Sequence, residues 1–147
     1  MESEFQCRNP EFERVVRQSF DKQAMMSTLG ATLRRVEAGR VDIEMAFDAR
    51  FTQQDGYLHA GAVATIADSA NGYAALSLAP AGTEVLAVEF KINLVRPVVG
   101  DRIVARGRVI RPGSSLTACM TEVYAQREGS SKLVALALGT IMLHPSA

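Results

Sequence analysis

One stretch of the chain, residues 60–79, restricts the possible folds more than any other. It is almost wholly apolar or small, and its residues recur with a helical period. A helix that is apolar on every side is a buried helix. Because this one carries Asp68 and Asn71, we expect it to lie inside a domain and not in a bilayer. At about 1.5 Å per residue it is roughly 30 Å long, and Pro80, Ala81 and Gly82 end it.

Alternating apolar and polar residues on both sides of this helix predict an antiparallel sheet. Residues 31–36 and 41–47 form a predicted hairpin, and four more strands are expected at 86–94, 103–109, 116–126 and 133–143. The last strand is apolar on both faces, which favours a central or interface position. Residues 9–29 predict an N-terminal helix with Asn9 as its cap, a stripe of Phe12, Val15, Val16, Phe20 and Ala24, and Gly30 as its end.

The chain is therefore expected to be one α+β domain over residues 1–147, with residues 1–29 as a helical extension. Its antiparallel sheet packs on one long helix. Because the sheet would cover only part of that helix, we expect a second subunit to complete the burial.

Composition excludes several classes of function. Lys plus Arg and Asp plus Glu both number 16, which argues against a nucleic-acid-binding protein. The two cysteines and two histidines are too few for a disulfide scaffold and argue against a metal site, so no metal is expected. No secretory signal or membrane span is visible, and a soluble cytoplasmic protein is the expectation.

The carboxylate of Asp68 is the first candidate for chemistry. At about 100° per residue it shares a helix face with small residues only, namely Gly61, Ala64, Thr65, Gly72 and Ala75. Such a face leaves a groove, and a buried carboxylate is costly unless it has a role or a partner. The alternative is that Asp68 lies on an exposed edge or bonds a partner's backbone, and the sequence leaves both open.

The start of the long helix adds a second feature. The N–H groups of Ala60, Gly61 and Ala62 lack partners within the helix and suit a carbonyl oxygen that gains charge. His59 before them is more often a capping residue than a catalyst, and Gln53 lies in the preceding polar loop. These parts suffice to hydrolyse an activated acyl group without a serine, cysteine or metal.

The segment from Gln53 to residue 79, and less specifically the chain after Gly30, resembles the hotdog-fold acyl-CoA thioesterases of the phenylacetate-degradation (PaaI-like) type. The resemblance rests on Gln53, the triplet His59-Ala60-Gly61 and the triplet Ile66-Ala67-Asp68. The strand before Arg96-Pro97 and the turn at Pro112-Gly113-Ser114 also match. The family has a glycine where this chain has Ala60, and alanine keeps the N–H while adding a methyl group.

The resemblance implies a sheet that wraps the helix, a homodimer or dimer of dimers, and an active site at the subunit interface. It makes Asp68 the base or nucleophile, Gln53 a positioning group and the Ala60 N–H the oxyanion donor. His59 and Gly61 then belong to the substrate site, and Arg96, Arg111 and Ser114 are candidates to meet the phosphates of coenzyme A, or else solvate the sheet. No cofactor is implied beyond coenzyme A as part of the substrate.

Several alternatives stay open at this point. The acyl group is a small aromatic one or a medium or long chain, and Tyr57, Leu58, Tyr73 and Leu76 line an acyl tunnel or belong to the core. Hydrogen bonds from Gln53, Thr65 or a partner subunit are expected to hold the pKa of Asp68 down. A non-hydrolytic acyl-CoA-binding or sensor module is the alternative function, and a hotdog dehydratase that uses His59 is a third.

Overall fold

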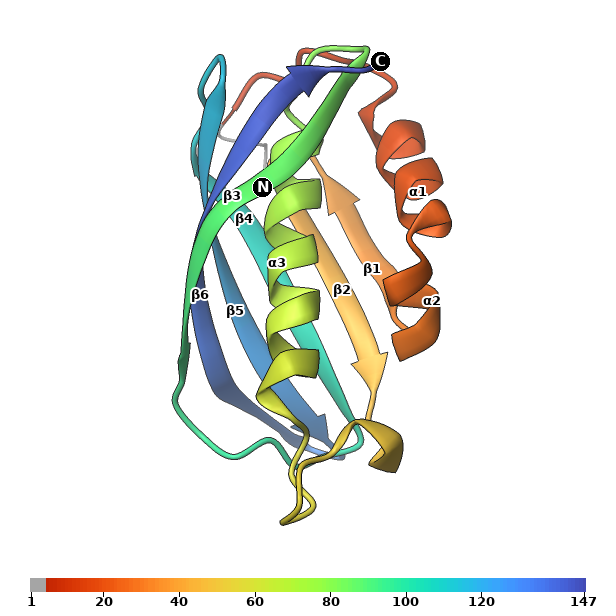
Figure 1. The fold of residues 1–147 in the computed structure, drawn as a ribbon, viewed down its shortest axis with the longest axis vertical. Helices are drawn as coiled ribbons and strands as arrows, with labels where there is room; N and C mark the ends of the chain where they lie inside the picture. Colours follow the sequence, from red (N-terminus) through yellow and green to blue (C-terminus); the bar gives the residue numbers. More distant parts are fainter. Residues whose placement is uncertain (1–4) are drawn as a thin grey trace.

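The computed structural model describes residues 5–147, which form one six-stranded antiparallel sheet packed against a long helix (Figure 1). The sheet order is β1-β2-β4-β5-β6-β3. The elements are α1 (Phe12–Lys22), α2 (Ala24–Leu29), β1 (Thr32–Glu37), β2 (Arg40–Ala46), a 3₁₀ turn (Ala49–Phe51), α3 (Ala60–Leu76), β3 (Thr83–Leu94), β4 (Arg102–Arg111), β5 (Leu116–Arg127) and β6 (Ser130–Pro145). This arrangement confirms the predicted α+β hotdog fold with an additional N-terminal helical segment.

Helix α3 is the buried element that the sequence predicts, although it ends at Leu76 and not at residue 79. Its buried side packs against five strands of the sheet. A Cβ atom at Gly107 in β4 would overlap the carbonyl of Ala70, so only glycine permits this close approach of helix and sheet. On the same side, the Thr121 hydroxyl donates to Asn71 Oδ1 at 2.7 Å. These contacts fix the rotation of α3 and hence the direction in which its opposite face points.

Strand β3 forms an edge of the sheet, and this edge has no strand beside it within residues 5–147. Of the five apolar residues predicted to alternate along residues 86–94, only Ile92 is partly buried, and Leu86, Val88, Phe90 and Leu94 are exposed. A β-bulge between Ala87 and Glu89 also shifts the alternation, so that Leu86 and Val88 do not continue the face of Ile92. Strand β6, apolar on both faces, lies between β5 and β3, as expected for an interior strand.

The N-terminal segment forms two helices where one was predicted. The chain leaves the helical conformation at Gln23, whose ψ is 100°, and continues as α2 until Gly30, which has a φ of 65°. Of the predicted apolar stripe, Val16 and Phe20 are buried, but Ala24 is exposed. Both helices lie beside α3 on the side away from β3, so that one face of α3 remains between them and the edge strand (Figure 1). No helix among the described residues is long and apolar enough to span a bilayer.

Candidate active site

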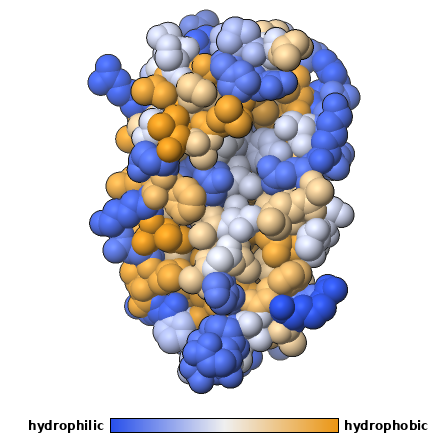
Figure 2. Space-filling model, viewed as in Figure 1, coloured by the Kyte–Doolittle hydropathy of each residue, from blue (hydrophilic) through white to orange (hydrophobic). Residues whose placement is uncertain are grey.

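The face of α3 that points away from the sheet forms a shallow groove, here called the α3 groove. It is bounded by β3 on one side and by α1 and α2 on the other. Its floor residues are small or short and at least partly exposed: Gly61, Ala64, Thr65, Asp68, Ser69 and Gly72. In Figure 2 the centre of this face is a pale strip with hydrophobic surface on both sides. The predicted small-residue face is therefore confirmed, except that Ala75 is buried against the sheet.

Asp68 lies in the middle of this groove and is half-buried. Its Oδ1 atom is inaccessible to solvent and has no hydrogen-bond partner among the described residues. The Thr65 hydroxyl, one of the donors expected for it, donates instead to the carbonyl of Gly61 at 2.7 Å. Burial therefore raises the pKa of the Asp68 carboxyl above its usual value, contrary to the expectation that hydrogen bonds hold it down. A carboxylate of this kind is a stronger base than an exposed one.

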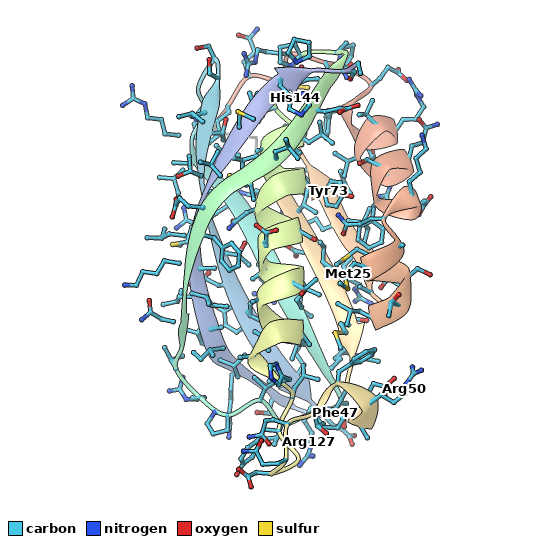
Figure 3. The ribbon with its side chains drawn as sticks, in the orientation of Figure 1. Met25, Phe47, Arg50, Tyr73, Arg127 and His144 are labelled. Carbon is cyan, nitrogen blue, oxygen red and sulfur yellow. The ribbon has the colours of Figure 1, made fainter. Side chains whose placement is uncertain are left out.

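Two depressions meet at Asp68. The larger, of about 510 Å³, extends toward the start of α3 and has exposed Met25 and Phe90 as its apolar walls. The smaller, of about 150 Å³, extends toward the other end of α3 and is here called the distal recess; it is lined by Ser19, Gln23, Asp68, Ser69, Gly72, Tyr73, Val85, Ala87 and Ile141. Figure 3 shows Met25 and Tyr73 in the space between α3 and the N-terminal helices. Asp68 thus has room for a ligand on both sides along the helix.

The start of α3 presents one free N–H group and not the three that were expected. The Gly61 N–H donates to His59 Nδ1 at 2.8 Å, and the Ala62 N–H donates to the His59 carbonyl at 3.0 Å. His59 is therefore the cap of the helix. Among the described residues no acceptor receives the Ala60 N–H, so this group alone is available to a ligand at the positive end of the helix dipole.

Gln53 and Ala60 line a common depression of about 400 Å³, together with Tyr57, Leu58 and residues 94–98. The loop that carries Gln53 is closed by its N–H, which donates to the Tyr57 carbonyl at 2.8 Å. The Gln53 Oε1 atom accepts from the Asp55 N–H, and its amide nitrogen makes no hydrogen bond among residues 5–147. A free amide donor and a free backbone N–H therefore face the same space.

Asp68 does not share that space within one protomer. Ala60 and Asp68 are eight residues apart on one straight helix, which separates them by about 12 Å. A single carbonyl group cannot contact both at once. The structure therefore gathers Gln53, Ala60 and Arg96 in one depression and leaves Asp68 in another.

Comparison with known proteins gives the family of this chain. The Thioesterase superfamily model matches residues 55–132, more than half of the chain, including Ala60 and Asp68. The chain belongs to the thioesterase superfamily. It is 29% identical to the proofreading thioesterase EntH of Klebsiella pneumoniae over 122 residues, which cover 83% of this chain and 88% of EntH.

Two solved structures show the same fold. A thioesterase family protein from Silicibacter pomeroyi has a TM-score of 0.90 and 42% identity, over 92% of this chain and 99% of that one. The E. coli PaaI protein, from the phenylacetic acid degradation operon, has a TM-score of 0.84 and 22% identity, over 95% and 98% of the two chains. The family match and the thioesterase relatives identify a thioester hydrolase, and the likeness to PaaI shows that the fold is the same.

The remaining candidates of this thioesterase lie apart. Arg96 is exposed beside the Gln53 depression, where it donates to the Leu133 carbonyl at 2.8 Å. Arg111 and Ser114 are exposed near the opposite end of α3. The Arg8 side chain links the two places, because it donates to the carbonyl of Leu78, just after α3, and to the carbonyl of Gly113, next to Ser114. Within one protomer, Arg111 and Ser114 therefore do not join Arg96.

Of the four proposed tunnel residues, Tyr57 and Leu58 line the Gln53 depression and Tyr73 lines the distal recess. Leu76 follows the other alternative, because it is buried in the core between helix and sheet. Cys119 is buried as well, and burial raises the pKa of its thiol to about 12, which makes it inert as a nucleophile.

Four residues that line the thioesterase's depressions were not recognised from the sequence: Ser19, Gln23, Met25 and Phe90. Three of them belong to the N-terminal helical segment, outside the region that the family model matches. Their amphipathic pattern indicates a helix but does not say which element that helix faces. Gln23 is held in place by the Ser69 hydroxyl, which donates to its Oε1 at 3.1 Å.

Proposed function

We propose that the protein is an acyl-CoA thioesterase in which Asp68 is the general base or nucleophile and the Ala60 N–H is the oxyanion donor. The observation that carries this proposal is the Asp68 carboxylate, whose Oδ1 atom is buried without a partner in a groove lined by small residues. An uncompensated carboxylate lowers the stability of the fold and is expected where it serves a reaction. Its raised pKa suits proton abstraction.

In the general-base route, Asp68 removes a proton from a water molecule, and the resulting hydroxide attacks the thioester carbonyl carbon. The negative charge then moves to the carbonyl oxygen, which accepts a hydrogen bond from the Ala60 N–H. The carbon–sulfur bond breaks, and the proton on Asp68 passes to the departing thiolate. The products are the carboxylic acid and coenzyme A. In the nucleophilic route, Asp68 itself attacks the thioester carbonyl carbon, the carbon–sulfur bond breaks and coenzyme A leaves as the thiolate. Water then hydrolyses the resulting anhydride and frees Asp68 and the carboxylic acid.

Both routes need Asp68 and Ala60 at the same carbonyl, which the separation of about 12 Å along one helix prevents. The site is therefore shared between two protomers: Asp68 of one protomer acts with Gln53 and Ala60 of the partner subunit. The Gln53 amide nitrogen, free of other hydrogen bonds, orients the water or the thioester.

Strand β3 is the contact surface that this homodimer requires. It is a twelve-residue edge strand with free backbone groups, and Leu86, Val88, Phe90 and Leu94 along it are all more than 40% exposed. A long exposed apolar edge is a template for pairing with another strand. Two copies joined through β3 form one continuous antiparallel sheet, and their α3 grooves face the same side of it. Two such dimers would associate into a dimer of dimers through other exposed apolar surface.

The test is hydrolysis of a panel of acyl-CoA thioesters, from short and long aliphatic to aromatic, with detection of the released thiol. Wild type is expected to hydrolyse at least one, and Asp68→Asn to lower kcat by about 10²- to 10⁴-fold. Asp101→Asn is the matched control, because Asp101 is exposed and outside the groove. An Asp68→Asn protein that hydrolyses a good substrate at the wild-type rate would refute the assignment. Binding of acyl-CoA without thiol release would favour the non-hydrolytic module.

A further inference from the structure

The distal recess has features that the hydrolytic chemistry itself does not require. It begins at Asp68, runs along α3 toward Tyr73, and is walled by the N-terminal helices on one side and by β3 on the other. Tyr73 lies at its far end, where it packs against Phe20 with ring centroids 5.8 Å apart and its hydroxyl lies 3.5 Å from that of Ser19. The recess is thus a short, half-open space directly beside the proposed base.

Gly72 forms the floor of this recess and is unusual for its place. It lies inside a regular α-helix, where glycine lowers helix stability relative to alanine. A Cβ atom built at this position has no other atom within 4 Å, so neither packing nor backbone conformation requires glycine here. Because Gly72 lines the recess, a larger side chain at this position would occupy part of its space.

We propose that the distal recess receives the acyl group of the substrate and that Gly72 sets the size of the acyl group it admits. This inference rests on the proposed thioesterase function and adds a specificity-determining residue and a substrate size. The volume of about 150 Å³ matches a cavity that holds one benzene ring. The recess thus accepts an acyl group of about six carbon atoms, straight or cyclic, and excludes long chains.

The direction of the substrate follows from the two spaces that meet at Asp68. The depression toward the helix start is more than three times larger, at about 510 Å³, and one wall of it is the exposed side chain of Met25. A long pantetheine arm needs such an open approach. The distal recess, on the other side of Asp68, suits the acyl group at the opposite end of the substrate. The thioester carbonyl then lies between them, next to the carboxylate.

Gln23 and Ser19 bring the N-terminal helical segment into the wall of this recess. Both lie outside residues 55–132, which the family model matches, and Gln23 is fixed by its hydrogen bond from Ser69. The N-terminal segment therefore contributes to the wall that faces the acyl group. Substitutions in the recess are expected to change which acyl group is used more than how fast the best one reacts.

The experiment measures kcat/KM for acetyl-, butanoyl-, hexanoyl-, octanoyl- and dodecanoyl-CoA with wild type, Gly72→Ala and Gly72→Val. Wild type is expected to lose at least tenfold in kcat/KM between hexanoyl- and dodecanoyl-CoA. Gly72→Val is expected to lower the hexanoyl-to-acetyl ratio of kcat/KM at least tenfold, with Gly72→Ala between the two. Ala81→Leu, an added side chain in an exposed turn outside the groove, should leave the chain-length profile of wild type unchanged.

A second measurement separates failure of this inference from failure of the proposed function. Non-hydrolysable methyl, hexyl and dodecyl thioethers of coenzyme A are bound to the same variants, and their affinities are read from thermal stabilisation. Weaker binding of the hexyl compound by Gly72→Val, with methyl binding retained, supports the recess even in a protein that hydrolyses nothing. Equal length profiles in wild type and Gly72→Val, in either measurement, would overturn the proposal. Circular dichroism confirms that each variant is folded.

Discussion

The Ala60 N–H can be removed without disturbing the helix that carries it, which makes Ala60→Pro a sharp test of the oxyanion donor. Ala60 is the first residue of α3, where proline is favoured because its missing N–H has no helical partner. His59 already has φ −63° and ψ 139°, the extended conformation that a residue before proline adopts. The substitution therefore deletes one free donor and breaks no hydrogen bond among the described residues.

Loss of one oxyanion donor lowers kcat by about 10²- to 10³-fold. Ala60→Pro is expected to show this loss in a thiol-release assay on the best substrate, while its thermal unfolding temperature stays at or above that of wild type. Affinity for a coenzyme A thioether reports whether the proline ring also blocks binding. Ala60→Gly, which keeps the N–H and restores the family's residue, is the control and should remain active. An Ala60→Pro protein with wild-type kcat would refute the role of this N–H.

Mixing Ala60→Pro with Asp68→Asn tests whether the site is shared. If Asp68 of one protomer works with Ala60 of the partner subunit, each heterodimer contains one intact site and one site with both changes. Random reassociation makes half of the dimers mixed, so about one quarter of the wild-type activity returns. If both residues acted from the same chain, every site would keep one defect and no activity would return. The mixture is refolded from denaturant and compared with each variant refolded alone.

Three further predictions concern stability and pH. Because burial raises the pKa of Asp68, the folded protein binds its proton more tightly than the unfolded chain does, so ionised Asp68 lowers stability above that pKa. Asp68→Asn is accordingly expected to raise Tm at neutral pH by about 2–4 °C in calorimetry. This gain should shrink as the pH falls through the pKa of Asp68, and the kcat of wild type should decline over the same pH range. His59→Ala removes the cap of α3 and is expected to lower the free energy of unfolding by about 1 kcal/mol in denaturant titration, with reduced kcat. Thr121→Val removes the hydrogen bond to buried Asn71 and is expected to lower the free energy of unfolding by about 1–3 kcal/mol. Unchanged stability would contradict a stabilising role of this hydrogen bond.

Element type and order were predictable because hydrophobic period separates helix from strand over long segments. The central helix, the first hairpin and the four later strands all appear where the pattern places them. The bulge in β3 was not predictable, because one inserted residue reverses the apparent face of every residue before it. The break at Gln23 was missed for a related reason, since apolar residues recur on both sides of it without a proline or glycine between them.

The candidate site was predictable in its parts and not in its assembly. The small face around Asp68 follows from helical geometry, and the structure bears it out. The capping role expected for His59 is confirmed, but the sequence does not show which N–H it occupies, because its Nδ1 reaches the Gly61 N–H only in this conformation. Gly61 permits it, since a Cβ there would lie 3.0 Å from His59 Nδ1. The sequence also cannot show that Gln53 and Asp68 open into different spaces.

Three energetically unfavourable features lie on the same side of the molecule: the unpartnered Oδ1 of Asp68, the glycine at position 72 and the free apolar edge of β3. On the side of α3 that faces the sheet, the Ser77 hydroxyl accepts from the Gly39 N–H and Thr121 donates to Asn71, and the buried atom there without a partner among the described residues is the uncharged Asn71 Nδ2. Features that lower stability collect at functional sites, where a bound group relieves them. In the proposed complex, a second copy paired through β3 would cover the edge and bring the partner's donors to Asp68, and an acyl group would fill the space above Gly72. One assembled complex with substrate thus accounts for all three, whereas a monomeric binding module leaves at least the edge unexplained.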